Sequence, residues 1–361
     1  FTLRYRNGSG TLVNIENYTL AFRLEQNIDI SPFIRDFLDV YEIINVRVVI
    51  NGSISGIPQT PIVDEYFAVD GYGYYEEGYN KDFESYLRND VAFYAGSNKT
   101  IYRNRKESLN IPLLNPSSAV GANNGTFINY YQGNELIYTD STDFGYGFNT
   151  LDYLVTEDRV QYISLDEFPS SFQDRVVSDG GVVESENCSD SYDDLYSEKT
   201  PDKVVIVPYN DQSASYEINI VPVTECKYTP YRLVFRNKFG VREDMWFFKK
   251  STNEITTSRE SYRANNKSSY ISGDLSKHSY ASYNVNGRES LSLNTGFVPE
   301  SFNENIRQLM LSEQVWITVD NQRIPVTIKN SQKLLKKSVN EKLINYEIDI
   351  EFAFDAINTI G

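Results

Sequence analysis

The side chains that most often perform catalysis or bind metal ions are scarce in this sequence. Its 361 residues include one histidine, His278, and two cysteines, Cys188 and Cys226. A single histidine excludes a site built from several histidines, and the cysteines lack the C-x-x-C spacing of zinc and redox sites. No G-x-S-x-G motif presents a serine nucleophile. We therefore expect His278, which lies among polar residues, to be a surface side chain.

The two cysteines are expected to remain reduced. Cys188 and Cys226 have no histidine near them in the sequence, and thiols stay reduced in proteins that are assembled inside a cell. A disulfide bond between the two stays open as the alternative.

Carboxylates are abundant, with 50 Asp and Glu against 34 Lys and Arg and a formal net charge of −16. Such a surface repels phosphate backbones, so the charge argues against a nucleic-acid partner. Glycoside hydrolysis needs a pair of carboxylates, but nothing in the sequence distinguishes two of the 50. The expectation is therefore a protein that is not an enzyme and has no catalytic residue, cofactor or metal site.

One acidic stretch, residues 184–202, combines carboxylates with serine and few aliphatic side chains. Its spacing does not match the calcium-binding loop D-x-[DN]-x-[DN]-G with its terminal glutamate. We interpret it as an acidic linker between a β- and loop-rich middle section at 113–183 and a β-rich C-terminal domain at 203–361. A β-rich N-terminal domain at 1–112 precedes them.

Two segments rich in glycine and aromatic residues, 70–78 and 144–148, are candidates for contact with a partner. The chain has 28 Tyr and 20 Phe, and tyrosine suits interfaces because it combines apolar area with a hydroxyl. The first segment is no phosphate loop, since no lysine follows its glycines and its glutamates repel phosphate. Either it packs its own aromatic side chains, or it presents them to a partner chain or a sugar. The candidate assembly interface consists of Tyr72, Tyr74, Tyr75, Phe144, Tyr146 and Phe148.

Hydrophobic patterning predicts a mainly β fold of antiparallel β-sandwich-type domains with a few short helices. The clearest strand is 344–354, where every second residue is apolar and one face must enter a core. Helices are expected near 31–40, 82–89 and 301–312. Ser31 and Pro32 begin the first, and Ser301 with Glu304 forms a capping box for the last, which we expect to pack on strand 344–354. The other predicted strands include 2–6, 18–24, 44–50, 204–207, 216–221, 232–236, 245–249, 315–319 and 324–328.

No apolar run approaches the roughly 20 residues that a membrane span requires. The chain begins with Phe1, and no basic and apolar leader opens it. We expect no membrane span.

The region after residue 224 carries a resemblance to a known group of proteins. The segment E-C-K-Y-T-P-Y-R-L-V-F-R-N-K-F-G at 225–240 leads into M-W-F-F-K-K-S at 245–251. This order of inner strand, N-x-x-G turn and aromatic strand resembles a pattern in uncharacterised structural proteins of tailed bacteriophages. Some of those proteins belong to the distal-tail or baseplate group. The segments 70–74, 290–298, 315–328 and 351–355 are similar to the same pattern.

The resemblance implies a virion structural protein, a tail adaptor, distal-tail or baseplate component that is assembled in the host cytoplasm. Its partners would be other virion proteins and copies of itself in a symmetric ring or trimer. A receptor- or carbohydrate-binding tail module, which would also contact a host-surface receptor, is the alternative, and a glycan-degrading tail enzyme is a third reading. Only two tryptophans, Trp246 and Trp316, are present. Both fall in predicted strands, which weakens a sugar-stacking platform.

Overall fold

The structure is a computed structural model, and it confirms the predicted class. The chain is mainly β, with antiparallel sheets of the sandwich type and a few short helices. The described residues are 2–6, 12–17, 30–38, 43–54, 57–77, 93–97, 99–104, 110–114, 125–143, 160–164, 201–208, 215–263, 278–320, 322–329 and 343–357. The predicted strand at 18–24 and the predicted helix at 82–89 lie outside them.

The chain divides into two compact units, each built from several separate segments. Unit 1 contains Phe1–Thr224, Phe235–Met245 and Glu304–Ser312. Unit 2 contains Glu225–Val234, Trp246–Asn303 and Glu313–Gly361. Two short pieces of the C-terminal region, a hairpin turn and most of one helix, therefore belong to unit 1.

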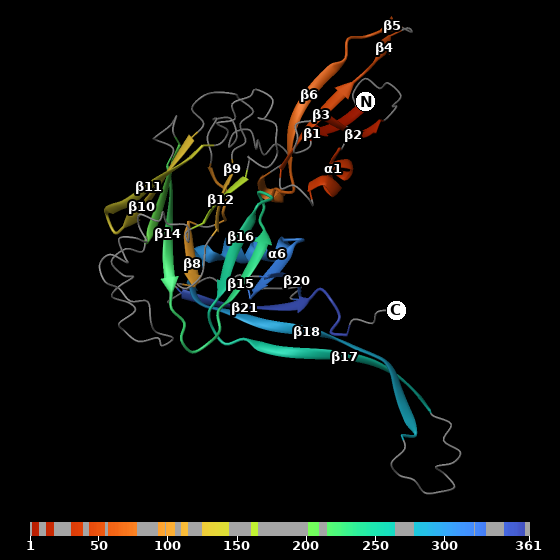
Figure 1. Cartoon of the computed structure of the whole chain (residues 1–361), viewed down its shortest axis with the longest axis vertical. Coiled ribbons are helices and arrows are strands. Elements are labelled where there is room, and N and C mark those ends of the chain that lie inside the picture. The colour runs from red at the N-terminus through yellow and green to blue at the C-terminus, as the bar shows by residue number, and fades with distance from the viewer. Residues whose placement is uncertain are drawn as a thin grey trace. The chain divides into compact units, whose positions relative to one another are not determined.

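The first sheet of unit 1 is four-stranded, with the order β2-β1-β3-β6 (Figure 1). It consists of β2 (Leu12–Asn17), β1 (Thr2–Arg6), β3 (Ile43–Ile50) and β6 (Ile62–Val69). Between β3 and β6 lies the short hairpin of β4 (Ser53–Ile54) and β5 (Ile57–Pro58). Helix α1 (Ser31–Leu38) begins at the predicted residue, and its Ile34 is buried.

Two further sheets of unit 1 form a sandwich around one apolar core. The five-stranded sheet has the order β11-β10-β13-β14-β8, and the three-stranded sheet has the order β12-β9-β7. The core takes side chains from both, including Ile128 and Ile206 from the larger sheet and Ile111 and Leu113 from the smaller one. The strands are β7 (Phe93–Tyr94), β8 (Thr100–Asn104), β9 (Asn110–Leu114), β10 (Gly125–Gln132), β11 (Glu135–Asp143), β12 (Val160–Ser164), β13 (Lys203–Pro208) and β14 (Tyr216–Val223).

The predicted linker at 184–202 lies outside the described residues except for Pro201 and Asp202. Strands on its two sides share one sheet, because β13 pairs with β10 and β14 pairs in parallel with β8. The predicted boundary at residue 203 therefore does not coincide with an edge between sheets.

Unit 2 is built on a seven-stranded sheet with the order β16-β15-β19-β20-β21-β18-β17. Strands β15 and β16 cross the division between the units, since the turn that joins them belongs to unit 1. The strands are β15 (Tyr231–Arg236), β16 (Arg242–Phe247), β17 (Thr252–Arg263), β18 (Tyr280–Pro299), β19 (Val315–Val319), β20 (Gln322–Ile328) and β21 (Leu343–Phe352).

The alternation predicted for 344–354 is confirmed along most of its length. Ile344, Tyr346, Ile348 and Ile350 are all buried, and the side chains between them are more accessible. The alternation stops with the strand, because β21 ends at Phe352 and Phe354 is exposed.

Two details of the prediction are corrected by the structure. Helix α6 (Asn303–Leu311) begins after a 3-10 turn, η4 (Glu300–Phe302), so Ser301 lies inside that turn and not in front of the first helical turn. The prediction that both cysteines are reduced is also wrong, because Cys226 is disulfide-bonded. The other cysteine of the sequence, Cys188, lies outside the described residues. Pairing depends on proximity in space, which spacing along the chain does not reveal.

Candidate functional site

The candidate site lies in unit 1, where three segments far apart in the sequence meet. They are the Gly/Tyr loop at 70–77, the hairpin turn at 237–241 between β15 and β16, and helix α6. The loop ends in a 3-10 turn, η1 (Tyr75–Glu77). All three segments are distinctive in the sequence, but their proximity is visible only in the structure.

The hairpin turn is shaped by Asn237 and Gly240. The side-chain oxygen of Asn237 accepts hydrogen bonds from the backbone N–H of Phe239 at 3.0 Å and of Val241 at 3.3 Å. Asparagine favours turns because its side chain can bond its own backbone in this way. Gly240 has a φ of +80°, a conformation that glycine adopts without steric cost. The N-x-x-G pattern is therefore a turn whose conformation requires those residue types.

The loop and the turn approach each other backbone to backbone. The N–H of Tyr72 donates to the carbonyl oxygen of Lys238 at 2.9 Å. A Cβ atom on Gly71 would lie 2.5 Å from that same oxygen, so a larger residue does not fit without a shift of the backbone. On the other side, a Cβ on Gly240 would lie 3.0 Å from the carbonyl carbon of Asp70. The glycines of both motifs thus permit this docking, and Asp70 adds an ion pair with Arg236.

Tyr74 connects the loop to helix α6. Its hydroxyl donates a hydrogen bond to Oε1 of Glu304 at 2.7 Å, and the guanidinium carbon of Arg307 lies 3.7 Å from the centre of its ring. The ammonium of Lys238 lies 5.1 Å from the same ring centre. Burial, together with the hydrogen bond to the Glu304 carboxylate, raises the pKa of the Tyr74 hydroxyl. Two cations near one aromatic ring stabilise the site through cation–π attraction.

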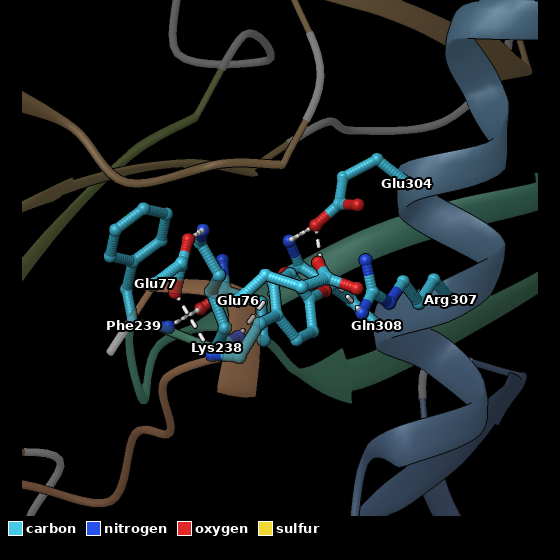
Figure 2. A network of polar contacts seen from close by, with 9 residues as sticks. Glu76, Glu77, Lys238, Phe239, Glu304, Arg307 and Gln308 are labelled. Carbon is cyan, nitrogen blue, oxygen red and sulfur yellow. Dashed lines mark hydrogen bonds and ion pairs between the residues drawn. The ribbon is translucent and has the colours of Figure 1, made fainter. Parts of the chain in front are cut away.

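Polar contacts complete the connection, as Figure 2 shows. Lys238 forms an ion pair with Glu77 at 3.1 Å, and Arg307 forms a longer one with Glu76 at 3.5 Å. The side-chain oxygen of Gln308 accepts a hydrogen bond from the backbone N–H of Lys238 at 3.1 Å. Helix α6 therefore contacts both the loop and the hairpin turn through side chains on one face.

A buried carboxylate, Glu243 on β16, lies beneath these contacts. Its Oε2 accepts hydrogen bonds from the backbone N–H of Ser97 at 3.0 Å and from Nδ2 of Asn237 at 3.1 Å. Its Oε1 accepts from Oγ of Ser97 at 2.5 Å and from Nδ2 of Asn305 at 2.9 Å. The carboxylate thus connects the segment after β7, the hairpin turn and helix α6.

Burial raises the pKa of Glu243 to about 7, against the hydrogen bonds from Ser97 and Asn237, which lower it. The negative charge of neighbouring Asp244 raises it further. A strongly shifted pKa can mark a catalytic acid or base. Here, however, four donors occupy the acceptor positions that a carboxylate offers. The geometry therefore describes a carboxylate that holds chain segments together and leaves no lone pair for a substrate.

The structure places the six candidate interface residues in different surroundings. Tyr72 and Tyr74 are half-buried and lie edge to face, with ring centres 5.8 Å apart. Tyr75 is 93% exposed. Phe144, Tyr146 and Phe148 lie outside the described residues. Contact with another chain stays a prediction for all six, but Tyr72 and Tyr74 have partners in their own chain.

Several residues of the site were not singled out by sequence reasoning. Glu243 had no signal in the sequence, because it precedes the predicted strand 245–249 and is one of 50 acidic residues. Glu304 was assigned to a capping box, whereas its carboxylate accepts hydrogen bonds from Tyr74 and Gln308. Asn305 and Gln308 are polar residues that lie buried in the helix. Their positions directly before the apolar Ile306 and Leu309 were a signal that the sequence offered.

Metal binding and membrane insertion receive no support from the part of the chain that the structure describes. Within it no group of three or more His, Cys, Asp or Glu residues could hold a metal ion. His278 is exposed. None of the helices in the described ranges is long and apolar enough to cross a membrane.

Comparison with family models, with characterised proteins and with solved structures finds no match for this chain.

Proposed function

We propose that this chain is a structural protein of a tailed bacteriophage virion, a tail adaptor, distal-tail or baseplate component that acts by protein–protein assembly. The resemblance of the segments at 70–74 and 225–251 to such proteins supports the assignment to a phage. The structure adds a physical reason for these motifs, because Gly71 and Gly240 permit the two segments to dock. The disulfide of Cys226 is compatible with a particle that ends in oxidising surroundings.

The observation that carries the assembly role is the presentation of Tyr75. Its neighbour Tyr74 is fixed by a hydrogen bond and two cations, and Glu77 is fixed by Lys238. Tyr75 itself is 93% exposed. A large aromatic side chain on a fixed loop loses little conformational entropy when it enters a partner, and tyrosine is enriched among the residues that dominate interfaces. We infer that Tyr75 is an anchor for another virion protein or another copy.

The alternative is a receptor- or carbohydrate-binding tail module, in which Tyr75 stacks on a sugar. The tryptophans argue against it, since Trp246 is buried and Trp316 is half-buried. A glycan-degrading enzyme would need two accessible carboxylates, and the most perturbed one in the site, Glu243, is enclosed by donors.

The test uses a phage that lacks its own copy of the chain and receives a Tyr75→Ser variant in trans. The variant is expected to fold like the wild type, since an exposed substitution changes stability by about 0.5 kcal/mol or less. It should enter particles poorly, as measured by immunogold labelling and by quantitative mass spectrometry of purified virions. Tyr228→Ser, on a half-buried tyrosine of unit 2 outside the site, is the control.

Absence of the wild-type chain from purified particles would refute the virion assignment. If Tyr75→Ser enters particles normally but no longer binds a glycan array that retains the wild type, the alternative module is correct.

A further inference from the structure

Strands β17 and β18 of unit 2 continue beyond the rest of their sheet as a two-stranded ribbon (Figure 1). β18 pairs with β21 only from Ser290 to Pro299, whereas its pairing with β17 extends back to Tyr280. Every residue of β17 is exposed. A two-stranded ribbon is marginally stable alone in water. Since none of the described segments covers β17, the ribbon is a candidate surface for a partner.

The two faces of the ribbon differ in charge. From the pair Ser258–Asn286 to the pair Glu260–Tyr283, the register moves by two residues on β17 and by three on β18. The extra residue therefore lies on β18, and the side chains of β17 alternate between the two faces without interruption. Successive side chains of a strand point to opposite faces. Glu254 and Glu260 therefore share one face of β17.

The opposite face of β17 carries Ile255, Arg259 and Arg263. Directly opposite residues of paired strands share a face, so Tyr283 joins the Glu260 side and Tyr280 joins the Arg263 side. We call the set Glu254, Glu260, Tyr262 and Tyr283 the acidic face, and the set Ile255, Arg259, Arg263 and Tyr280 the basic face.

Both faces also expose apolar area. On the acidic face the rings of Tyr262 and Tyr283 lie 5.8 Å apart, edge to face, and both are exposed. On the basic face Tyr280 is 67% exposed. That face continues the core side of the sheet, because Asn253, two residues before Ile255, is paired with the buried Leu291. The core side of the sheet of unit 2 thus continues onto the ribbon, where Ile255 and Tyr280 are exposed.

Each face also carries one residue of the opposite charge. Arg288 lies on the acidic face opposite Thr256, but it is engaged by Asp355 at 3.0 Å and Glu351 at 3.6 Å in its own chain. Glu289 lies opposite Ile255 on the basic face. Beyond residue 258 the charges of β17 are Glu260 on one face and Arg259 with Arg263 on the other, so the distal part of the ribbon keeps the contrast.

We propose that the basic face of the ribbon packs on the acidic face of the ribbon of a second copy of this chain. The arginines of one copy then meet the glutamates of the next, and Tyr280 of one copy contacts the exposed tyrosine pair of the next. A contact between two different faces is heterologous, and such contacts close into rings when the rotation between copies permits. This inference rests on the proposed assembly function and specifies which copy-to-copy surface performs it. Copies that each carry a net charge of −16 repel one another, so a local match of opposite charges is needed to direct their contact.

The test measures self-association of the full chain by sedimentation velocity at constant ionic strength. The wild type should associate as its concentration rises. Arg259→Glu with Arg263→Glu makes both faces acidic, and Glu254→Arg with Glu260→Arg makes both faces basic. Each double variant alone should associate at least about tenfold more weakly than the wild type, because like charges then face each other.

An equimolar mixture of the two double variants should recover association, since copies with acidic faces can alternate with copies with basic faces. Matched controls reverse charges off the ribbon, with Lys250→Glu and Arg323→Glu for one variant and Glu300→Arg and Glu313→Arg for the other. All four residues are exposed, and both controls should associate like the wild type.

A monomeric wild type, undiminished association of either double variant, or a mixture that does not recover would overturn the inference. The proposed function is judged separately by the presence of the chain in purified particles. A chain that enters particles while its ribbon variants associate normally retains the function and loses this surface.

Discussion

Glu243 gives the sharpest test of the candidate site, because a buried carboxylate couples stability to pH. The perturbation is Glu243→Gln, which keeps the shape of the side chain and removes its charge. Asn305 can turn its amide over to present its oxygen to the new NH2 group, and the Ser97 hydroxyl can rotate so that its Oγ accepts a hydrogen bond from that group. The variant is therefore expected to fold.

The magnitude follows from the pKa of Glu243, which burial raises from 4.5 to about 7. An acid with a raised pKa in the folded state binds more protons when folded than when unfolded, so its contribution to stability is fully present below the unfolded pKa. That contribution is lost as pH rises through about 7. Between about pH 5 and pH 8 the linkage relation gives a loss of about 2.5 kcal/mol for the wild type. The Gln variant lacks this dependence.

The assay is hydrogen exchange of the β16 amides, which reports the local free energy of opening in unit 1. The difference in opening free energy between wild type and Glu243→Gln is compared at the two pH values. Groups that titrate alike in both proteins do not contribute to this difference. Glu313→Gln, at an exposed position off the ribbon, is the control and should follow the wild type. Equal pH dependence in wild type and Glu243→Gln would refute the reasoning. A carbon-13 NMR titration of the Glu243 carboxyl gives a second reading, and a midpoint near 4.5 would refute it independently.

The remaining predictions concern the loop and the disulfide. Tyr74→Phe should lower the free energy of unfolding by about 1–3 kcal/mol in urea denaturation, since it removes a hydrogen bond to a carboxylate and keeps the ring near Lys238 and Arg307. An unchanged midpoint would contradict this. Gly71→Ala should cost about 1–3 kcal/mol because its Cβ meets a backbone oxygen. Gly73→Ala, whose Cβ meets nothing closer than 3.8 Å, should be tolerated, and equal effects of the two would exclude the proposed docking. Peptide mapping without reductant should recover a peptide that contains Cys226 linked to one that contains Cys188. Cys226→Ser should lower the free energy of unfolding by about 2–4 kcal/mol. Recovery of free thiols alone would show that both cysteines are reduced.

The regular strands with a buried face were predictable from sequence. Strand 344–354 and the strand that became β3 show this best, because an apolar residue at every second position can be buried only if the chain is extended. The N-x-x-G turn at 237–240 was also recognisable, since asparagine and glycine are residue types that turns require. These features depend on neighbours within a few residues.

The β17–β18 ribbon was not predicted from the sequence, because it lacks the buried apolar face by which the other strands were recognised. T-N-E-I-T-T-S-R-E-S-Y-R at 252–263 has no apolar face, and strand patterning detects a strand by the face that it buries. Its strand conformation depends on backbone pairing with residues 280–292.

The candidate site was predicted in its parts and not in its assembly. The sequence by itself determined that 70–78 is a loop with aromatic side chains, that 237–240 is a turn, and that a helix follows residue 299. Only the tertiary structure decided that Tyr74 meets Glu304, 230 residues away, and that Gly71 is needed because a backbone from 237–240 passes beside it. It also decided that Glu243 is buried among four donors. Local patterns encode which backbone conformation a segment can adopt, whereas burial, pKa and hydrogen-bond partners depend on which distant segments come to lie beside it.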